Sequence, residues 1–374
     1  MKTNYKLRGT PNSPVLIFSH SLGANTAMWD GVAELLLPYF RVIQYDTRGH
    51  GHSESPAGEY TLEELGRDVI HLMDSLGIQK ASFCGLSMGG LIGQWLGINA
   101  PERIEKLIIS NTAARIGTAE GWQQRINVVK ASGLADLAEP MMPRWFADAC
   151  LKEKPALIAD IISNFIANNP DGYTSCCAAI RDADLREDLR KIAIKTLVIN
   201  GEDDAVTTVS DAEYLANHIP GAQLKIVPGR HLPATEDPAN YAEVLLNFLV
   251  GESVYDRGMF VRKTVLGEAH VNKAQAGLND FNTDFQEFIS KYAWGEIWTR
   301  PGLEKKERSI LTLGLMIALN RAAEFKMHVR AAFNNGLTKE EIKEVIMHSA
   351  LYCGLPAANE AIHLAEEIFS EIDQ

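Results

Sequence analysis

The chain is poor in positive charge and has no long apolar run. Its 36 Lys and Arg residues are outnumbered by 48 Asp and Glu residues, which gives a formal net charge of −12 at pH 7. Surfaces that bind nucleic acid or anionic membranes need clustered Lys and Arg to neutralise phosphate. No segment reaches the roughly 18 apolar residues of a membrane-spanning helix, and the N-terminal segment lacks the apolar stretch of a secretion signal. We therefore expect a cytoplasmic protein with neither a nucleic-acid nor a membrane partner.

Cysteine is also scarce, and its pattern excludes two kinds of site. The five cysteines are Cys84, Cys150, Cys176, Cys177 and Cys353. They form neither a CxxC pair nor a Cys/His spacing typical of zinc, so we expect reduced, mostly buried thiols and no metal. His50 and His52 resemble a metal pair by their spacing, but they follow a predicted strand and we assign them to a structural loop.

The pattern along the chain predicts two domains, since 374 residues exceed what one hydrophobic core usually fills. Between Val15 and Val250, short β-branched runs alternate with amphipathic stretches, a pattern typical of a mainly parallel sheet with helices on both faces. Residues 119–184 interrupt this alternation with helix-forming sequence only. The first fold class is therefore α/β, with an inserted helical lid.

Beyond Gly251 the character of the sequence changes, because from about Leu278 its patterns are helical only. The segment 304–336 reads as one helical pattern ending at Gly336, and Thr338 with Glu341 forms a capping box that starts the next helix. We place an α/β domain at residues 1–252 and a small all-α domain at residues 253–374.

A candidate nucleophile lies in the first domain. The sequence Gly85-Leu86-Ser87-Met88-Gly89 follows the strand-like ASFC and precedes a helical pattern. In this strand–turn–helix context GxSxG indicates a nucleophile elbow, in which the glycines allow a strained turn that lifts the serine hydroxyl above the sheet. The motif alone is weak, and its context and partners make it strong.

The partners of Ser87 follow in the chain order used by α/β-hydrolases, which is serine, acid and histidine. Asp203 and Asp204 come after the strand KTLVIN, and we favour Asp204, while His231 comes after QLKIV. His231 would take the serine proton and Asp204 would orient the imidazole.

Two backbone amides are the expected oxyanion donors. One is that of Met88, the residue after Ser87, and the other is that of Leu22, in the loop after the first long strand.

A second candidate cluster lies in the helical domain. Glu324 and His328 are four residues apart on one predicted helix face, and Arg321 lies nearly on the same face. His348, on the following helix, would approach them in a helical hairpin. From spacing alone, a solvated ion-paired face is the simpler interpretation of this cluster.

Two family resemblances sharpen these expectations. Residues 14–250, with SHSLGAN, YDTRGHGHS, GLSMGG, GEDD and PGRHLPATEDP, resemble the 3-oxoadipate enol-lactone hydrolases of the α/β-hydrolase superfamily. Residues 255–370, with YDRGMFVRKTVLGEAHV and HVRAAFNNGLTKEEIKEVIMHSALYCGLPAAN, resemble 4-carboxymuconolactone decarboxylase. In the protocatechuate branch of the 3-oxoadipate pathway, the decarboxylase makes the enol-lactone that the hydrolase opens.

The resemblances imply a bifunctional, cofactor-free enzyme acting on small lactone carboxylates. They match Glu324, His328 and His348 to functional positions of the decarboxylase family, and they imply a homo-oligomer formed through the helical domain. Because both substrates are anionic, Arg125 and Arg144 in the lid, together with Arg321, are candidates for binding their carboxylates. The alternative is a serine esterase, lactonase or cofactor-free peroxidase whose helical domain serves assembly only.

Overall fold

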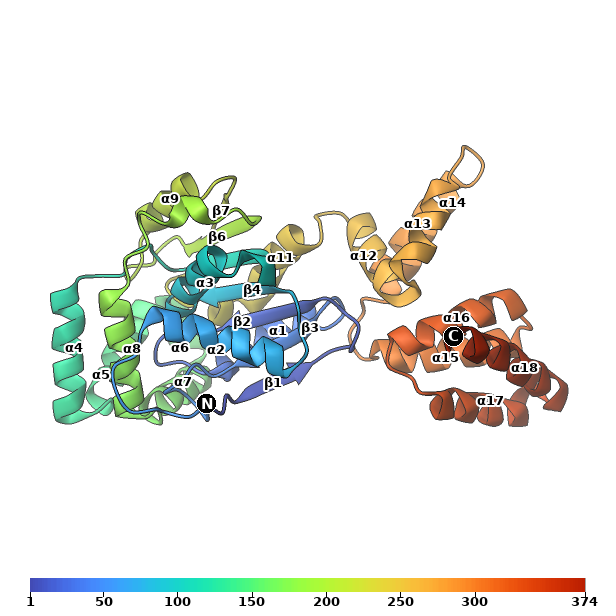
Figure 1. Ribbon diagram of the computed structural model, residues 1–374, viewed down its shortest axis with the longest axis horizontal. Helices are drawn as coiled ribbons and strands as arrows, with labels where there is room; N and C mark the ends of the chain where they lie inside the picture. Colours follow the sequence, from blue (N-terminus) through green and yellow to red (C-terminus); the bar gives the residue numbers. More distant parts are fainter. Residues whose placement is uncertain (374) are drawn as a thin grey trace. The chain divides into compact units, whose positions relative to one another are not determined.

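The computed structural model describes residues 1–373, which form an α/β unit and a helical unit (Figure 1). The α/β unit comprises Met1–Leu7, Val15–Leu35 and Val42–Leu249. The helical unit comprises the described residues from Val250 onward together with Arg8–Pro14 and Leu36–Arg41. The domain boundary after residue 252 stays a prediction.

A seven-stranded sheet in the order β1-β3-β2-β4-β5-β6-β7 forms the centre of the α/β fold. The strands are β1 (Tyr5–Arg8), β2 (Val15–Ser19), β3 (Arg41–Tyr45), β4 (Ala81–Leu86), β5 (Ile104–Ser110), β6 (Thr196–Gly201) and β7 (Gln223–Val227). Strands β2 and β4 to β7 run parallel, with Leu86 opposite Ser110 and Gly201 opposite Val227. The carboxyl ends of these strands therefore meet at one edge, which is where α/β folds place their sites.

Helices cover both faces of this sheet, as the alternating pattern predicted (Figure 1). They are η1 (Thr26–Trp29), α1 (Asp30–Leu36), α2 (Leu62–Ser75), α3 (Met88–Asn99), η2 (Pro101–Arg103), η3 (Leu189–Lys191), α9 (Val209–His218), α10 (Pro233–Glu236) and α11 (Pro238–Leu249). Helix α3 packs directly on β4 and β5. It carries four glycines whose Cβ atoms would meet neighbouring residues, and this close packing holds its N-terminus at the sheet edge.

Five helices between β5 and β6 form the lid. They are α4 (Ala119–Ser132), α5 (Ala135–Trp145), α6 (Asp148–Glu153), α7 (Pro155–Ile166) and α8 (Pro170–Asp182). The ring of Phe165 makes edge contacts with Trp145 and Tyr173, at centroid distances of 5.7 Å and 5.6 Å. This aromatic cluster joins α5, α7 and α8 into one body.

The helical unit ends in a four-helix bundle formed by α15 to α18. The helices of the whole unit are α12 (Val254–Leu266), α13 (Glu268–Ala276), α14 (Thr283–Ile289), the π-helix η4 (Ser290–Ile297), α15 (Lys305–Ala318), α16 (Ala322–Asn334), α17 (Lys339–Cys353) and α18 (Leu355–Ile372). In the bundle, α15 packs on α16 and α17, and α18 packs on the same two helices. Helices α16 and α17 are therefore diagonal to each other. Thr338 and Glu341 form the predicted capping box.

The segment predicted as one helix over residues 304–336 is broken in the structure. Helix α15 ends at Ala318, Asn320 has φ +53°, and the amide of Arg321 donates to the carbonyl of Met316. This is a Schellman ending, which an Asn in the left-handed conformation supports. Arg321 lies before α16 as its N-cap, so the expectation that it shares a helix face with Glu324 is wrong.

The cysteines are all free, and all except the half-buried Cys353 are buried. In residues 1–373, no helix combines the length and apolar character needed to cross a membrane.

Replacing Phe325 by Ala should destabilise the bundle strongly. The Phe325 side chain is 2% exposed and packs in the core between the helices, so its truncation should cost about 3–5 kcal/mol of unfolding free energy. Phe281 is 97% exposed, and Phe281→Ala is the matched control that should change stability by less than about 0.5 kcal/mol. Urea unfolding followed by circular dichroism compares the two variants, and equal effects would contradict this packing.

Candidate active site

The candidate nucleophile Ser87 lies in a strained turn between β4 and α3. Its backbone has φ +57° and ψ −111°, a conformation that a non-glycine residue rarely adopts. A Cβ atom on Gly85 would lie 1.9 Å from the carbonyl oxygen of Gly89, and one on Gly89 would lie 2.3 Å from that of Ser19. Glycine at both positions therefore lets the chain turn sharply enough to present Ser87 at the sheet edge.

The structure brings Asp204 and His231 together at the same edge. Asp204 follows β6 and His231 follows β7, and the imidazole Nδ1 lies 2.8 Å from the Asp204 Oδ2. Both side chains are buried. The carboxylate can only accept here, so Nδ1 carries the proton and Nε2 keeps the lone pair that a general base needs.

A dense set of donors keeps Asp204 ionised. Burial alone would raise the pKa of its carboxyl, but hydrogen bonds from His231, Asn111 and the amide of Val206 outweigh it and hold the pKa below its usual range. Asp203 is exposed and makes no side-chain contact with His231 in residues 1–373. The geometry therefore favours Asp204 as the acid.

Asn111 is a site residue that the sequence did not reveal. It follows β5 with φ +45°, and its side-chain amide donates both to Asp204 (2.8 Å) and to the carbonyl of Arg230 (3.1 Å). Asn111 thus links the loop that carries Asp204 to the loop that carries His231. The only signal was a polar residue directly after a buried strand, and such residues are too common to single out.

Two backbone amides are available as oxyanion donors. Met88 is the first residue of α3, so its N–H has no acceptor within the helix and lies at the positive end of the helix dipole. The Leu22 amide has no hydrogen-bond acceptor among the described residues. These are the two amides that the motif pattern predicted for the oxyanion hole.

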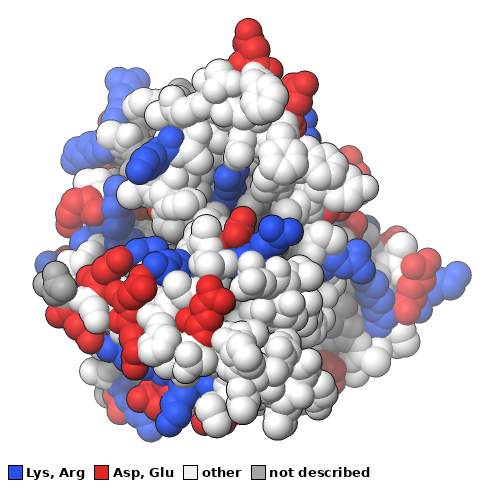
Figure 2. Space-filling model, turned by 90° about the vertical axis from the view of Figure 1, so that its right-hand side faces the viewer, with Lys and Arg blue, Asp and Glu red and all other residues white. Residues whose placement is uncertain are grey.

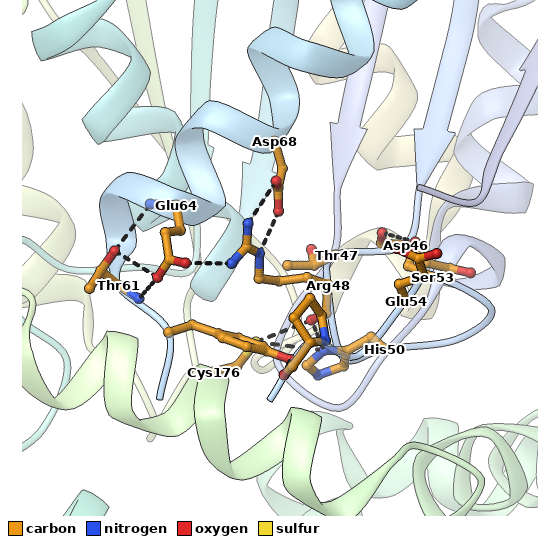
Figure 3. A network of polar contacts seen from close by, with 12 residues as sticks. Asp46, Thr47, Arg48, His50, Ser53, Glu54, Thr61, Glu64, Asp68 and Cys176 are labelled. Carbon is orange, nitrogen blue, oxygen red and sulfur yellow. Dashed lines mark hydrogen bonds and ion pairs between the residues drawn. The ribbon is translucent and has the colours of Figure 1, made fainter. Parts of the chain in front are cut away.

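The loop after β3 carries a network of polar contacts (Figure 3), and its His50 bonds to the amide of Gly23 in the loop after β2 that also carries Leu22, called the oxyanion loop below. Arg48 reaches from this loop to α2, where it forms ion pairs with Asp68 (2.6 Å) and Glu64 (2.8 Å). Asp46 accepts the Thr26 amide (2.8 Å). His50 lies on the same loop, buried beside Cys176. His52, in contrast to the buried His50, is exposed. Among residues 1–373, no group of three or more His, Cys, Asp or Glu side chains could hold a metal ion.

A cavity of about 450 Å³ lies between the oxyanion loop and the lid. Its walls come from the oxyanion loop and the following helix, the lid, and the segment after His231, namely Gly23, Ala24, Asn25, Ala27, Met28, Trp145, Leu157, Asp160, Ile161, Ser163, Asn164, Leu232 and Thr235. Gly23 and Leu232 are direct neighbours in sequence of Leu22 and His231. The cavity therefore adjoins the oxyanion loop and the segment after His231, and its volume is in the range of small-molecule pockets.

The two candidate arginines of the lid differ in setting. Arg125 is half-buried, with its guanidinium 5.3 Å from the ring centroid of Trp122 and its Nη1 3.4 Å from the hydroxyl of Tyr173. No Asp or Glu within residues 1–373 forms an ion pair with it. Arg144 is exposed near the end of α5. Arg125 therefore carries a positive charge that no Asp or Glu of the described residues pairs with.

The predicted residues of the helical unit are only partly assembled. Glu324 and His328 lie on α16, and the buried Nδ1 of His328 has no hydrogen-bond partner among the described residues. Burial lowers the pKa of His328, Glu324 raises it and His270 on α13 lowers it, so these three groups are near neighbours. His348 lies exposed on α17, with its ring 5.2 Å from that of Tyr352. Helices α16 and α17 are diagonal in the bundle, and an approach of His348 to His328 stays a prediction.

Comparisons with known proteins match both parts of the chain. A family model for the alpha/beta hydrolase fold matches residues 14–238, and one for the carboxymuconolactone decarboxylase family matches residues 283–367. The 3-oxoadipate enol-lactonase 2 of Acinetobacter baylyi is 43% identical over 63% of this chain and 88% of its own length. The 4-carboxymuconolactone decarboxylase of the same species is 55% identical over 32% of this chain and 90% of its own.

A solved structure agrees with the first match. The enol-lactonase of Burkholderia xenovorans superposes with a TM-score of 0.65 and 40% identity, covering 66% of this chain and 96% of its own. The chain thus belongs to the α/β-hydrolase fold family through its N-terminal part and to the carboxymuconolactone decarboxylase family through its C-terminal part.

Proposed function

We propose that this chain catalyses two consecutive reactions, the decarboxylation of 4-carboxymuconolactone to 3-oxoadipate enol-lactone and the hydrolysis of that lactone to 3-oxoadipate. The observation that carries the proposal is the presence on one chain of two domains whose relatives are named for these two activities. The product of one reaction is the substrate of the other, so the pairing has a chemical reason. The free cysteines fit a reducing cytoplasm as its location.

The decarboxylation can proceed without a cofactor. In the substrate, the carboxylate that leaves is on a ring carbon conjugated through a double bond to the lactone carbonyl. Loss of carbon dioxide leaves its electron pair as a dienolate spread onto the carbonyl oxygen, and one proton then returns to carbon. The protein has to bind the carboxylates and deliver that proton. His328 is our candidate proton carrier, with Glu324 beside it, and His348 and Arg321 are further candidates.

The hydrolysis follows from the geometry around Ser87. The serine oxygen attacks the lactone carbonyl while the Nε2 of His231 takes its proton, and the amides of Leu22 and Met88 bind the oxyanion. Collapse breaks the ring C–O bond and releases an enol, which leaves readily and tautomerises to the 3-oxo group. Water then attacks the acyl-Ser87 with the help of His231. Asp204 holds the imidazole throughout.

Arg125 is our candidate for binding the substrate's free carboxylate in the lid. Its cation has no acidic partner in residues 1–373, and it contacts Tyr173, whose ring packs on Phe165. Phe165 in turn lies against Gly23 of the oxyanion loop, where a Cβ atom would come within 2.5 Å of its ring. This chain of contacts leads from the arginine to the oxyanion loop.

We also propose that the helical unit assembles with copies of itself. Its surface exposes many large apolar side chains, among them Leu311, Leu315, Leu319, Met347, Leu351, Tyr352 and Leu355. Figure 2 shows broad areas without charged side chains on the face that it presents. Leu351, Tyr352 and Leu355 are at least 77% exposed, which is costly for apolar groups that nothing covers. His348 lies on α17 with Leu351 and Tyr352, and its ring contacts that of Tyr352.

Two variants should show opposite defects on 4-carboxymuconolactone. Ser87→Ala should release carbon dioxide at the wild-type rate and accumulate enol-lactone, because only the hydrolytic nucleophile is lost. His328→Ala should release little carbon dioxide but still open added enol-lactone. Carbon dioxide and 3-oxoadipate are measured together, with the oligomeric state checked by gel filtration.

The control for His328 is His363→Ala, since His363 is an exposed histidine of the same unit and should be dispensable. If the wild-type chain opens the enol-lactone but releases no carbon dioxide, the helical unit serves assembly only. If it neither releases carbon dioxide nor opens the lactone, the N-terminal unit is an esterase, lactonase or peroxidase for another substrate.

Two neighbouring aspartates test the assignment of the acid. Asp204→Asn should lower kcat for lactone opening on the order of 10⁴-fold, because an amide stabilises the wrong imidazole tautomer. Asp203→Asn should have little effect, since that side chain is exposed and away from His231. Steady-state kinetics on the enol-lactone compare the two, and a larger loss in Asp203→Asn would reverse the assignment.

Arg125→Met should raise KM for the anionic lactone with a smaller change in kcat. Loss of a charge-assisted hydrogen bond worth about 1.5–3 kcal/mol corresponds to a KM increase of roughly 10- to 150-fold. Arg144→Met is the matched control from the same lid, and p-nitrophenyl acetate is a neutral substrate that lacks the carboxylate. The assignment fails if Arg125→Met weakens the neutral ester as much as the lactone.

A further inference from the structure

A second histidine, outside the candidate triad, contacts the oxyanion loop. His50 is 1% exposed, and its Nε2 accepts a hydrogen bond of 2.9 Å from the amide of Gly23, the residue after Leu22. The hydrolytic mechanism above gives it no role. A buried imidazole bonded to the backbone of this loop is therefore unexplained by the triad chemistry.

The protonation state of His50 follows from its partners. A backbone amide can only donate, so Nε2 carries a lone pair, and Nδ1 carries the proton, which faces the carbonyl oxygen of Arg48 at 3.3 Å. Burial, reinforced by His20, lowers the pKa of His50 to about 3. The ring is therefore neutral at pH 7, and it is available as an acceptor.

The hydrogen bond fixes the peptide plane that follows the oxyanion donor. The carbonyl of Gly23 accepts from the Asn168 side chain (2.8 Å), whose oxygen in turn accepts the amide of Gly51 (3.1 Å). Gly23 itself has φ +81°. Both polar groups of Gly23 are thus bonded to residues outside the loop.

The preceding peptide plane is held in the same way by His20. Its Nδ1 donates to the carbonyl of Ser21 (2.7 Å), and its Nε2 accepts the amide of Thr47 (2.9 Å). In a trans peptide the N–H of Leu22 points opposite to the C=O of Ser21, so this bond sets the direction of the oxyanion donor. The His20 and His50 rings lie 5.2 Å apart.

We propose that His50 is a positioning residue for lactone opening, and that its lone pair holds the Leu22–Gly23 peptide so that the Leu22 amide stays aimed at the carbonyl oxygen of the substrate. The inference rests on the proposed hydrolytic reaction at Ser87. Without an acceptor at this point, the Gly23 N–H would be buried and unpaired, and the peptide would gain by rotating to find another partner. Rotation at Gly23 would turn the neighbouring donor away from the developing oxyanion, where alignment matters most.

The test compares side chains that do or do not place an acceptor near Gly23. His50→Gln can put its amide oxygen close to the position of Nε2, whereas the shorter His50→Asn places it near Nδ1, and His50→Leu offers none. His52→Leu is the matched control on the same loop, because the His52 side chain is exposed. Substrates are the enol-lactone and p-nitrophenyl acetate, and carbon dioxide release by the helical unit reports on the integrity of the rest of the chain.

We expect His50→Leu and His50→Asn to lose about 10²–10³-fold in kcat with little change in KM, as when an oxyanion donor is removed. His50→Gln should recover most of this loss, and His52→Leu should match the wild type. The affinity for a trifluoromethyl ketone that forms a tetrahedral adduct with the serine should fall in parallel with kcat.

Other outcomes would overturn the inference. Equal activity of folded His50→Gln and His50→Asn would show that the acceptor position does not matter, and an effect on KM alone would show a role in the lid only. If His50→Leu does not fold, the Gln and Asn pair carries the test. If the wild-type chain cleaves p-nitrophenyl acetate but not the enol-lactone, the proposed substrate fails while the His50 comparison on the ester still stands.

Discussion

The hydrolytic site depends on the strained turn at Ser87. Its positive φ puts the serine at the carboxyl edge of the sheet and starts α3 immediately afterwards, so the candidate nucleophile and one candidate oxyanion donor are adjacent in the chain. The turn requires glycine at two positions, because a Cβ atom on Gly85 would collide with the backbone of Gly89 and one on Gly89 would collide with the backbone of Ser19. Strain of this kind persists only where the surroundings are rigid, and the buried parallel strands provide that rigidity.

Around this turn, neutral buried side chains rather than ion pairs set the direction of the backbone amides. His20 and His50 both use one ring nitrogen as donor and the other as acceptor to bond backbone groups of the oxyanion and β3 loops. Such bonds act only while the rings stay uncharged, and burial lowers both pKa values. The carboxylate of the candidate acid, Asp204, is instead kept ionised by several donors. The backbone amides that would bind the anionic transition state are thus oriented by neutral imidazoles, which add no charge of their own to the site.

The sequence predicted what is local and periodic. The parallel sheet, the lid over α4 to α8 and the capping box at Thr338 follow from patterns within a few residues, and family resemblance gave the pairing of domains. Contacts between distant segments could not be read in this way, so Asn111 and the bond from His50 to Gly23 became visible only in the structure. Arg321 was misplaced because a single Asn at residue 320 ends a helix whose apolar pattern continues.

Joining the two units on one chain has a consequence that does not depend on how they are arranged. An enol-lactone is an activated ester, because its leaving group is an enol, and it is open to attack by any nucleophile once it is formed. A fused chain supplies one hydrolytic serine for each decarboxylating unit, whatever the level of expression. A ring opening assisted by an oxyanion hole with fixed donors can be fast enough to keep that intermediate scarce. The precision of the turn at Ser87 and of the loop that His50 holds therefore matters to the whole reaction sequence, since a slow second step would let the activated product of the first accumulate.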